Sequence, residues 1–323
     1  NTTWSLTSGG TAVAAGIYPK IGDNAIIESG KTVTLNTNTA NLTAISISSG
    51  STFTTTSSYT VTATTITVNG TYINGSTGTV TGTITIGATG IYQHNQDGGI
   101  IPTATWSSTS TCTITGYVSQ AGGVNGALTP FQSSMNQSFG NFTWNCPNQT
   151  AAFSLGGTVS NVSGNYSVIS TGSGSLAVGG VIDGNLTIAG NFIQNGGNFQ
   201  ISSSAARTMT VNGNFTKTGG TFDLTSTTTA SNPCILSLKG NFSFTGGTIT
   251  ESGASTNSEI DFAGTSQQTI ISTGTYSNKV NFVLLNGAIV DFGTSIISAG
   301  ATGNFTLRSE EHTSELQSHL NLV

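Results

Sequence analysis

A short phrase that recurs in the second half of the chain constrains its fold more than any other feature. Each copy reads Gly-Asn-Phe, then three residues, Gly-Gly, one residue and an apolar side chain. The copies begin at Gly190, Gly213 and Gly240, so successive copies are offset by 213 − 190 = 23 and 240 − 213 = 27 positions. A period of roughly 20–30 residues is typical of a solenoid, in which each repeat forms one coil of a stack.

The segments between turn residues have the pattern of β-strands. Residues 32–35 and 83–86 alternate threonine with apolar side chains, and such alternation buries one face of a strand and solvates the other. Threonine suits the solvated face because it is both β-branched and polar. Pairs such as Asn69-Gly70 mark tight corners, since both residue types tolerate positive φ.

We therefore predict an all-β fold, namely a right-handed parallel β-helix with coils of about 20–27 residues. An antiparallel sandwich is the alternative for many short strands, but its hairpins have no fixed long period. In a β-helix, equivalent positions of the repeat stack on one another. The predicted structural ladder is an internal aromatic column and a corner row of amides that bond to one another: Phe192, Phe215 and Phe242, and Asn191, Asn214 and Asn241.

The solenoid is predicted to span residues 1–307. A cap is expected over about residues 1–30, where Trp4, Tyr18 and Pro19 occur, because solenoids need capped ends. Residues 116–137 lack clear alternation, so we expect an irregular segment between two stretches of coils. Whether these form one stack or two is left open.

The last residues, 308–323, read RSEEHTSELQSHLNLV. This resembles the in-frame translation of a common sequencing adapter, so the segment is excluded from fold reasoning. We expect the natural sequence to be cut near Leu307. Two of the three histidines, His312 and His319, lie in this tail.

Composition and charge exclude several classes of function. Only 6% of the 323 residues are charged, against about a quarter in ordinary globular domains, so hydroxyls and amides must form the solvated surface. The net charge is −5, and without the tail's one arginine and three glutamates it is (7 − 1) − (12 − 3) = −3. Nucleic-acid binding needs a basic footprint, and a membrane helix needs about 20 apolar residues; neither is present. The chain opens abruptly at Asn1 with polar, strand-like sequence, so we expect a secreted or cell-surface protein whose export signal has been removed.

Three stretches resemble large secreted repetitive proteins of Bacteroidota, which are usually exported by the type IX system. They are residues 19–35, 92–116 and 139–149. The resemblance implies a β-helical, secreted or cell-surface protein that is often adhesive or structural. The C-terminal sorting domain of such proteins is missing, as expected for a truncated sequence.

The cysteines, Cys112, Cys146 and Cys234, are odd in number and widely spaced, which is typical of neither a metal site nor a disulfide framework. We expect buried thiols, with a Cys112–Cys146 bridge as the alternative.

A pair of carboxylates would indicate an enzyme, because β-helices also host enzymes that cleave polysaccharides, and glycoside hydrolysis needs two carboxylates about 5–10 Å apart. Asp223 aligns with Gln200 and Thr250 in the repeat, so no column of acids forms there. Glu259 and Asp261, two positions apart, are the best candidate pair; alternatively Glu259 is solvated and Asp261 caps a corner.

His94 and Asp97 could orient a base or bind a metal, or simply stabilise a loop. The Asp97-Gly98-Gly99 sequence occurs once, whereas calcium-binding solenoids use tandem copies. We therefore assign no catalytic residue, cofactor or metal. Trp106 and Trp144 are candidates for a sugar-stacking platform or for core burial.

The predicted function is that of an extracellular structural or adhesive solenoid without catalytic activity, with self-assembly into fibres as one option. Its predicted partners are further copies of the same chain, which it would contact through its end coils, or glycans on a surface. One alternative is a carbohydrate-binding or carbohydrate-cleaving β-helix, which requires an exposed groove with clustered acids or aromatics. A second alternative is ice binding by flat threonine arrays. It requires Thr-X-Thr in register on successive coils, and the uneven offsets between Gly190, Gly213 and Gly240 argue against it.

Overall fold

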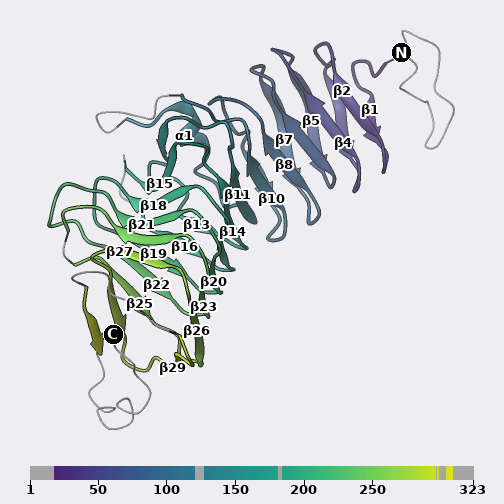
Figure 1. The fold of residues 1–323 in the computed structure, drawn as a ribbon. Coiled ribbons are helices and arrows are strands. Elements are labelled where there is room, and N and C mark those ends of the chain that lie inside the picture. Colours follow the sequence, from purple (N-terminus) through teal and green to yellow (C-terminus); the bar gives the residue numbers. More distant parts are fainter. Residues whose placement is uncertain are drawn as a thin grey trace. The chain divides into compact units, whose positions relative to one another are not determined.

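The computed structural model describes residues 18–120, 127–180, 184–255, 257–295, 297 and 303–307. Parallel β-strands stacked as a β-solenoid of about 12 turns make up this part of the chain (Figure 1). It divides into two compact units: the described residues up to 117, with 139–141, form the first, and the described residues of 118–138 and from 142 onward form the second. The parallel solenoid predicted from the repeat is confirmed.

Each coil of the first unit contributes a strand to each of two sheets. The first sheet has the order β1 (Asn24–Ile27), β3 (Leu42–Ile47), β5 (Val61–Val68), β7 (Val80–Ile86) and β9 (Ala104–Trp106). The second has the order β2 (Thr32–Leu35), β4 (Thr52–Thr55), β6 (Thr71–Asn74), β8 (Ile91–His94) and β10 (Thr111–Ile114). The coils of this unit are short and nearly equal in length. Each strand of the second sheet pairs in direct register with the next, so that Thr32, Thr52, Thr71, Ile91 and Thr111 stack on one another.

Coils of the second unit are longer and contribute to three rows of strands. The first row is β11 (Asn141–Asn145), β14 (Tyr166–Ser170), β17 (Phe192–Gln194), β20 (Phe215–Lys217), β23 (Phe242–Phe244), β26 (Gln268–Ser272) and β29 (Val290–Asp291). The second is β12 (Ala152–Ser154), β15 (Ser175–Gly179), β18 (Asn198–Ser202), β21 (Thr221–Thr225), β24 (Thr248–Glu251) and β27 (Thr275–Asn278). The third is β13 (Asn161–Val162), β16 (Leu186–Ile188), β19 (Arg207–Val211), β22 (Cys234–Leu238), β25 (Glu259–Phe262), β28 (Asn281–Leu284) and β30 (Phe305–Leu307).

The uneven repeat offsets leave the stacking register intact. Phe192, Phe215 and Phe242 are direct partners on β17, β20 and β23. The connection from β18 to β19 advances by 207 − 202 = 5 positions, and that from β21 to β22 advances by 234 − 225 = 9 positions. The excess of 9 − 5 equals that of 27 − 23 between the repeat offsets, so one loop absorbs all of the extra length.

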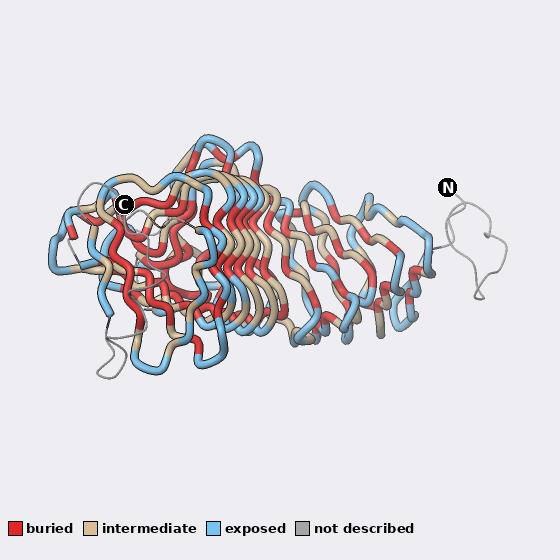
Figure 2. Tube along the Cα trace, turned by 60° about the horizontal axis from the view of Figure 1, so that its bottom comes forward, coloured by how far each residue is buried: buried red, intermediate tan, exposed pale blue. Residues whose placement is uncertain are grey.

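The core of the second unit is a continuous aromatic column along the stack. The ring centroids of Phe192 and Phe215 are 5.2 Å apart, as are those of Phe215 and Phe242, with interplanar angles of 19° and 15°. All three side chains are fully buried. Figure 2 shows buried and more exposed residues alternating along the strands, as expected where every second side chain points inward.

A short helix, α1 (Pro130–Ser134), lies within the segment predicted to be irregular. Thr129 forms a capping box with Gln132, and Pro130 occupies the first turn, where its missing N–H costs nothing. Residues 121–126 of that segment, residues 1–17 of the predicted cap and the tail 308–323 lie outside the described residues.

Candidate binding surface

One face of the first unit presents threonine in two straight rows. It consists of the outward residues of β2, β4, β6, β8 and β10, and we call it the threonine face. The first row is Thr32, Thr52, Thr71, Ile91 and Thr111, and the second is Thr34, Thr54, Ile73, Gln93 and Thr113. Each of these side chains is exposed or half-buried.

The inward residues of the same strands explain why the threonines face out. Phe53, Tyr72, Tyr92 and Cys112 alternate with the threonines and are buried. Phe53 and Tyr72 pack at a centroid distance of 5.3 Å, and Tyr72 and Tyr92 at 5.6 Å. Turning a strand over would expose this aromatic surface, so the register of the threonine rows is fixed by burial.

The hydroxyl groups of the threonine face are available to solvent or to a partner. Within the described residues, no hydrogen bond to the protein involves the seven threonine side chains of the face. Other threonines of the unit behave differently: Thr43 on β3 and Thr89 and Thr109 at corners donate to main-chain carbonyls of the preceding coil at 2.6–2.8 Å. These threonines use their hydroxyl groups to link neighbouring coils, whereas those of the threonine face do not.

The strands of the first unit carry no Asp, Glu, Lys or Arg. Charged side chains of this unit, such as Glu28, Lys31 and Asp97, lie in the described connections between strands. The threonine face is consequently neutral, with hydroxyls and methyl groups as its main functional groups.

A buried hydrogen-bond chain supports the threonine face from inside. Thr55 donates to the Asn74 Oδ1 at 3.0 Å, and the Asn74 amide donates to the Tyr92 hydroxyl at 2.9 Å. The Tyr92 hydroxyl lies 3.3 Å from the His94 Nδ1, and the His94 Nε2 lies 2.5 Å from the Gly98 carbonyl. Because a carbonyl only accepts, Nε2 carries the proton and Nδ1 accepts from Tyr92.

Burial lowers the pKa of His94 to about 4, opposed by the hydrogen bond to Gly98, so the imidazole is neutral near pH 7. This geometry supports the loop-stabilising interpretation of His94.

No group of three or more His, Cys, Asp or Glu residues that could hold a metal occurs in the described ranges. Cys112, Cys146 and Cys234 are buried and form no disulfide, so the alternative of a Cys112–Cys146 bridge is wrong.

The first row of strands in the second unit also has an uncharged outward row. Its members are direct partners on successive coils: Thr143, Ser167, Ile193, Thr216, Ser243 and Ile271. They are half-buried, apart from Ile271, which is 47% exposed. This row mixes threonine with serine and isoleucine and is less regular in chemistry than the threonine face.

The predicted asparagine row exists, but it bonds differently from the prediction. The Oδ1 of Asn191 accepts from the Asn214 main-chain N–H at 2.8 Å, and that of Asn214 accepts from the Asn241 N–H at 2.9 Å. The Asn241 Oδ1 in turn accepts from the Thr269 N–H at 2.8 Å. Each amide therefore satisfies the backbone of the next coil at the corner, where the strand ladder is interrupted, and the predicted bond between side chains is wrong.

A lysine whose role the sequence did not reveal closes one Gly-Gly corner from inside. The Lys217 Nζ donates to the carbonyls of Gly219 and Gly220 at 2.5 and 2.6 Å and lies 5.7 Å from the Phe244 ring centroid. Its partner on the preceding coil is Gln194, whose amide donates to the Gly197 carbonyl at 3.1 Å. The equivalence of Gln194 and Lys217 in the repeat is the signal that could have identified this role.

The acidic residues do not form an exposed pair. Glu259 and Asp261 both lie in β25; Glu259 is half-buried, and Asp261 is buried within the strand, not at a corner. Their partners on the preceding coil are Ile235 and Ser237, so the coil adds no further carboxylate.

A second pair, Asp223 and Glu251, was not anticipated. Burial raises the pKa of Glu251 to about 7, helped by Asp223 and opposed by Lys279, and burial also raises the pKa of Asp223, opposed by its hydrogen bonds with Ser252. Glu251 is only 4% exposed, which denies a polymeric substrate access to it.

Both tryptophans pack against other rings. Trp144 is fully buried and stacks on Phe153 at 5.5 Å. Trp106 is half-buried and packs edge-to-face on Phe139 at 4.9 Å. These positions favour the core interpretation over a sugar-stacking platform.

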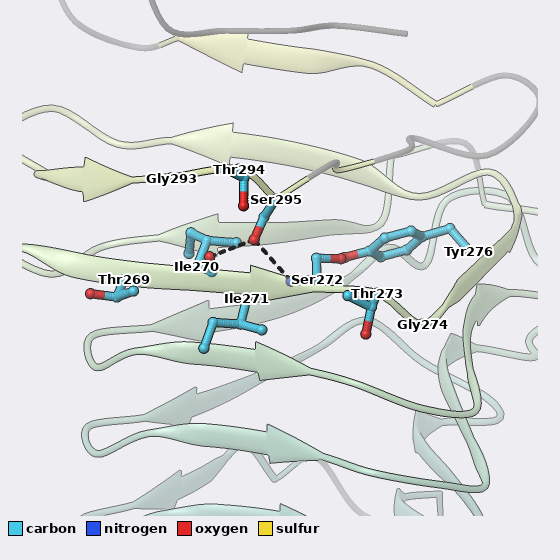
Figure 3. Close-up of a pocket in the computed structure, with 10 residues that line it drawn as sticks. All are labelled: Thr269, Ile270, Ile271, Ser272, Thr273, Gly274, Tyr276, Gly293, Thr294 and Ser295. Carbon is cyan, nitrogen blue, oxygen red and sulfur yellow. Dashed lines mark hydrogen bonds between the residues drawn. The ribbon is translucent and has the colours of Figure 1, made fainter.

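A cavity of about 640 Å³ lies beside β26 in the second unit. Figure 3 shows the Ser295 hydroxyl next to this strand, where it donates to the Ile270 carbonyl at 2.7 Å and accepts from the Ser272 N–H at 3.2 Å. Ser295 thus replaces a missing strand partner. The residues that line this cavity are threonine, serine, tyrosine, glycine and isoleucine, so its lining contains no carboxylate, imidazole, amine or thiol.

Comparison with known proteins gives one match. No curated protein and no solved structure shows significant similarity to the chain. No helix in the described part of the chain is long and apolar enough to cross a membrane. Residues 8–115 match the family model of the G8 domain, and this range contains every strand of the threonine face.

Proposed function

We propose that this protein is an extracellular structural protein that adheres to a neutral surface through its threonine face. The observation that carries the proposal is the pair of outward rows on β2, β4, β6, β8 and β10, whose ten positions hold seven threonines in register. A neutral, regular surface with unused hydroxyls suits multivalent contact with an extended, uncharged partner.

The extracellular location rests on the match of residues 8–115 to the G8 domain, a β-rich domain typical of extracellular proteins. Low charge supports it as well, since the surface relies on hydroxyls and amides. The proposal includes no catalytic step, because Glu251 and Asp261, members of the two acid pairs, are buried.

Retention of the full chain on solid surfaces tests this function. Neutral insoluble polysaccharides, ice and beads coated with the protein itself are incubated with labelled protein, and the bound fraction is compared with that of serum albumin. We expect retention on at least one surface, and loss of that retention when Thr52 and Thr54 are both replaced by lysine. Equal retention of the double variant and the original chain on every surface would remove the threonine face from the proposal.

A further inference from the structure

The threonine face is a regular grid whose spacing follows from the fold. Neighbouring strands lie about 4.8 Å apart, and alternate residues on one strand lie about 6.7 Å apart. The direct register from β2 to β10 keeps the rows aligned over all five strands. Threonine side chains are stiff at χ1, so their hydroxyls and methyl groups repeat with the same spacing as the backbone.

The interior holds this grid in place. Behind the face, Phe53, Tyr72 and Tyr92 pack against one another from coil to coil. Buried hydrogen bonds from Thr55 to Asn74 and from Asn74 to Tyr92 link the same strands. A partner that matches the grid would therefore meet hydroxyls that are already ordered, and ordering them would cost little entropy on binding.

The chemistry of the grid selects the kind of partner. Its strands carry no formal charge, and its seven threonine hydroxyls have no hydrogen-bond partner within the described protein. Crystalline water is neutral, excludes ions, and presents a periodic array of oxygens that both donate and accept hydrogen bonds. A neutral grid of hydroxyls, each able to donate and accept, complements such a lattice in charge as well as in hydrogen bonding.

We propose that the threonine face binds the surface of ice. The inference rests on the proposed function in one respect, since it assigns the partner of the same adhesive face. Ice is favoured over a polysaccharide because Phe53, Tyr72 and Tyr92 all point inward, which leaves the face without the aromatic rings on which sugars stack. The uneven offsets in the second unit, which argued against ice binding, are absorbed by a loop and do not affect these coils.

Inhibition of ice recrystallisation by the full chain tests the proposal, with thermal hysteresis as a second readout. The test variants are Thr52→Lys with Thr54→Lys, which place two charges in the centre of the face, and Thr52→Val with Thr54→Val, which keep the shape but remove two hydroxyls. The matched control is Thr56→Lys, at an exposed position that follows the same strand. Circular dichroism and thermal unfolding establish that each variant is folded.

We expect the original chain and the Thr56→Lys control to suppress crystal growth at the same concentration. The double lysine variant loses two hydroxyls and places two charges against the neutral ice surface, so it should need at least about tenfold more protein. The valine variant keeps the methyl rows and should lose less than the lysine variant.

An original chain no more active than serum albumin, or a folded double lysine variant as active as the original, overturns the proposal. Loss of retention on polysaccharide in the lysine variant, without any ice activity in the original chain, rejects ice and leaves the adhesive function standing. Ice activity without retention on polysaccharide or on protein-coated beads identifies ice as the partner.

Discussion

Replacing Lys217 by glutamine tests how the second unit closes its Gly-Gly corners. The Lys217 side chain is fully buried and donates to the carbonyls of Gly219 and Gly220. Burial lowers its pKa from 10.5 to about 8. Gln194 serves the equivalent corner on the preceding coil, so glutamine at position 217 has a precedent in the same stack.

The pH dependence follows from the two protonation equilibria of Lys217. Between pH 8 and 10.5 the unfolded chain holds a proton that the folded chain has lost, so stability rises with pH in this window. The gap of 10.5 − 8 = 2.5 corresponds to about 3 kcal/mol at about 1.36 kcal/mol per pH unit. The unfolding free energy of the original chain minus that of Lys217→Gln should therefore be constant below pH 8 and rise by about 3 kcal/mol by pH 10.5.

Urea unfolding followed by fluorescence from pH 7 to 10.5 measures this difference. Tyrosines and cysteines of the unfolded chain ionise in or near the same range, but they are present in both proteins and their contributions cancel in the subtraction. Lys239→Gln is the matched control for the loss of a lysine, because Lys239 is exposed and its replacement leaves the interior of the stack unchanged. A difference curve for Lys217→Gln that is flat, or that falls with pH, would refute the role assigned to burial of Lys217.

Three further predictions concern the core. Phe215→Ala should cost about 3–5 kcal/mol of unfolding free energy because it opens a cavity in the aromatic column, while Thr216→Ala, its outward neighbour, should stay within about 0.5 kcal/mol; urea unfolding that finds equal effects would contradict the column. Because burial lowers the pKa of His94 from 6.5 to about 4, the stability of the original chain relative to His94→Gln should fall by about 3 kcal/mol as pH drops from 6.5 to 4; acid titration of both proteins checks the sign. The three cysteines are buried, so a thiol reagent should label none of them in the folded chain and all of them in urea, and rapid labelling without urea would contradict their burial.

Much of the second unit could be predicted because its repeat encodes a register. The Gly-Asn-Phe phrase correctly placed the phenylalanine column, and the second glycine of each Gly-Gly pair occupies a corner with positive φ: Gly197 at 71°, Gly220 at 69° and Gly247 at 78°. Residues with a side chain rarely adopt this backbone conformation. Alignment of the repeat also placed Asp223 beside Gln200 and Thr250.

Other features could not be predicted, since they depend on which atoms meet at a corner. The asparagine row bonds to the next coil's backbone because a corner leaves N–H groups without a strand partner, and the sequence gives no information on which group is nearest. The threonine face required the pairing of strands such as β2 and β4, whose sequences share little beyond alternation. Sequence spacing alone also does not show whether the register is kept, because it does not separate length in a loop from length in a strand.

The connection between β21 and β22, residues 226–233, has a consequence for how this chain can change. Its extra length leaves the positions of Phe215 and Phe242 unaffected, so an insertion there extends outward from a fixed frame. Each coil of the second unit can thus gain or lose residues at such a corner while the stacked strands keep their register and spacing. A foreign peptide grafted at this site would be displayed at a defined height along the stack, and grafts at the same corner of neighbouring coils would be separated by the strand spacing of about 4.8 Å.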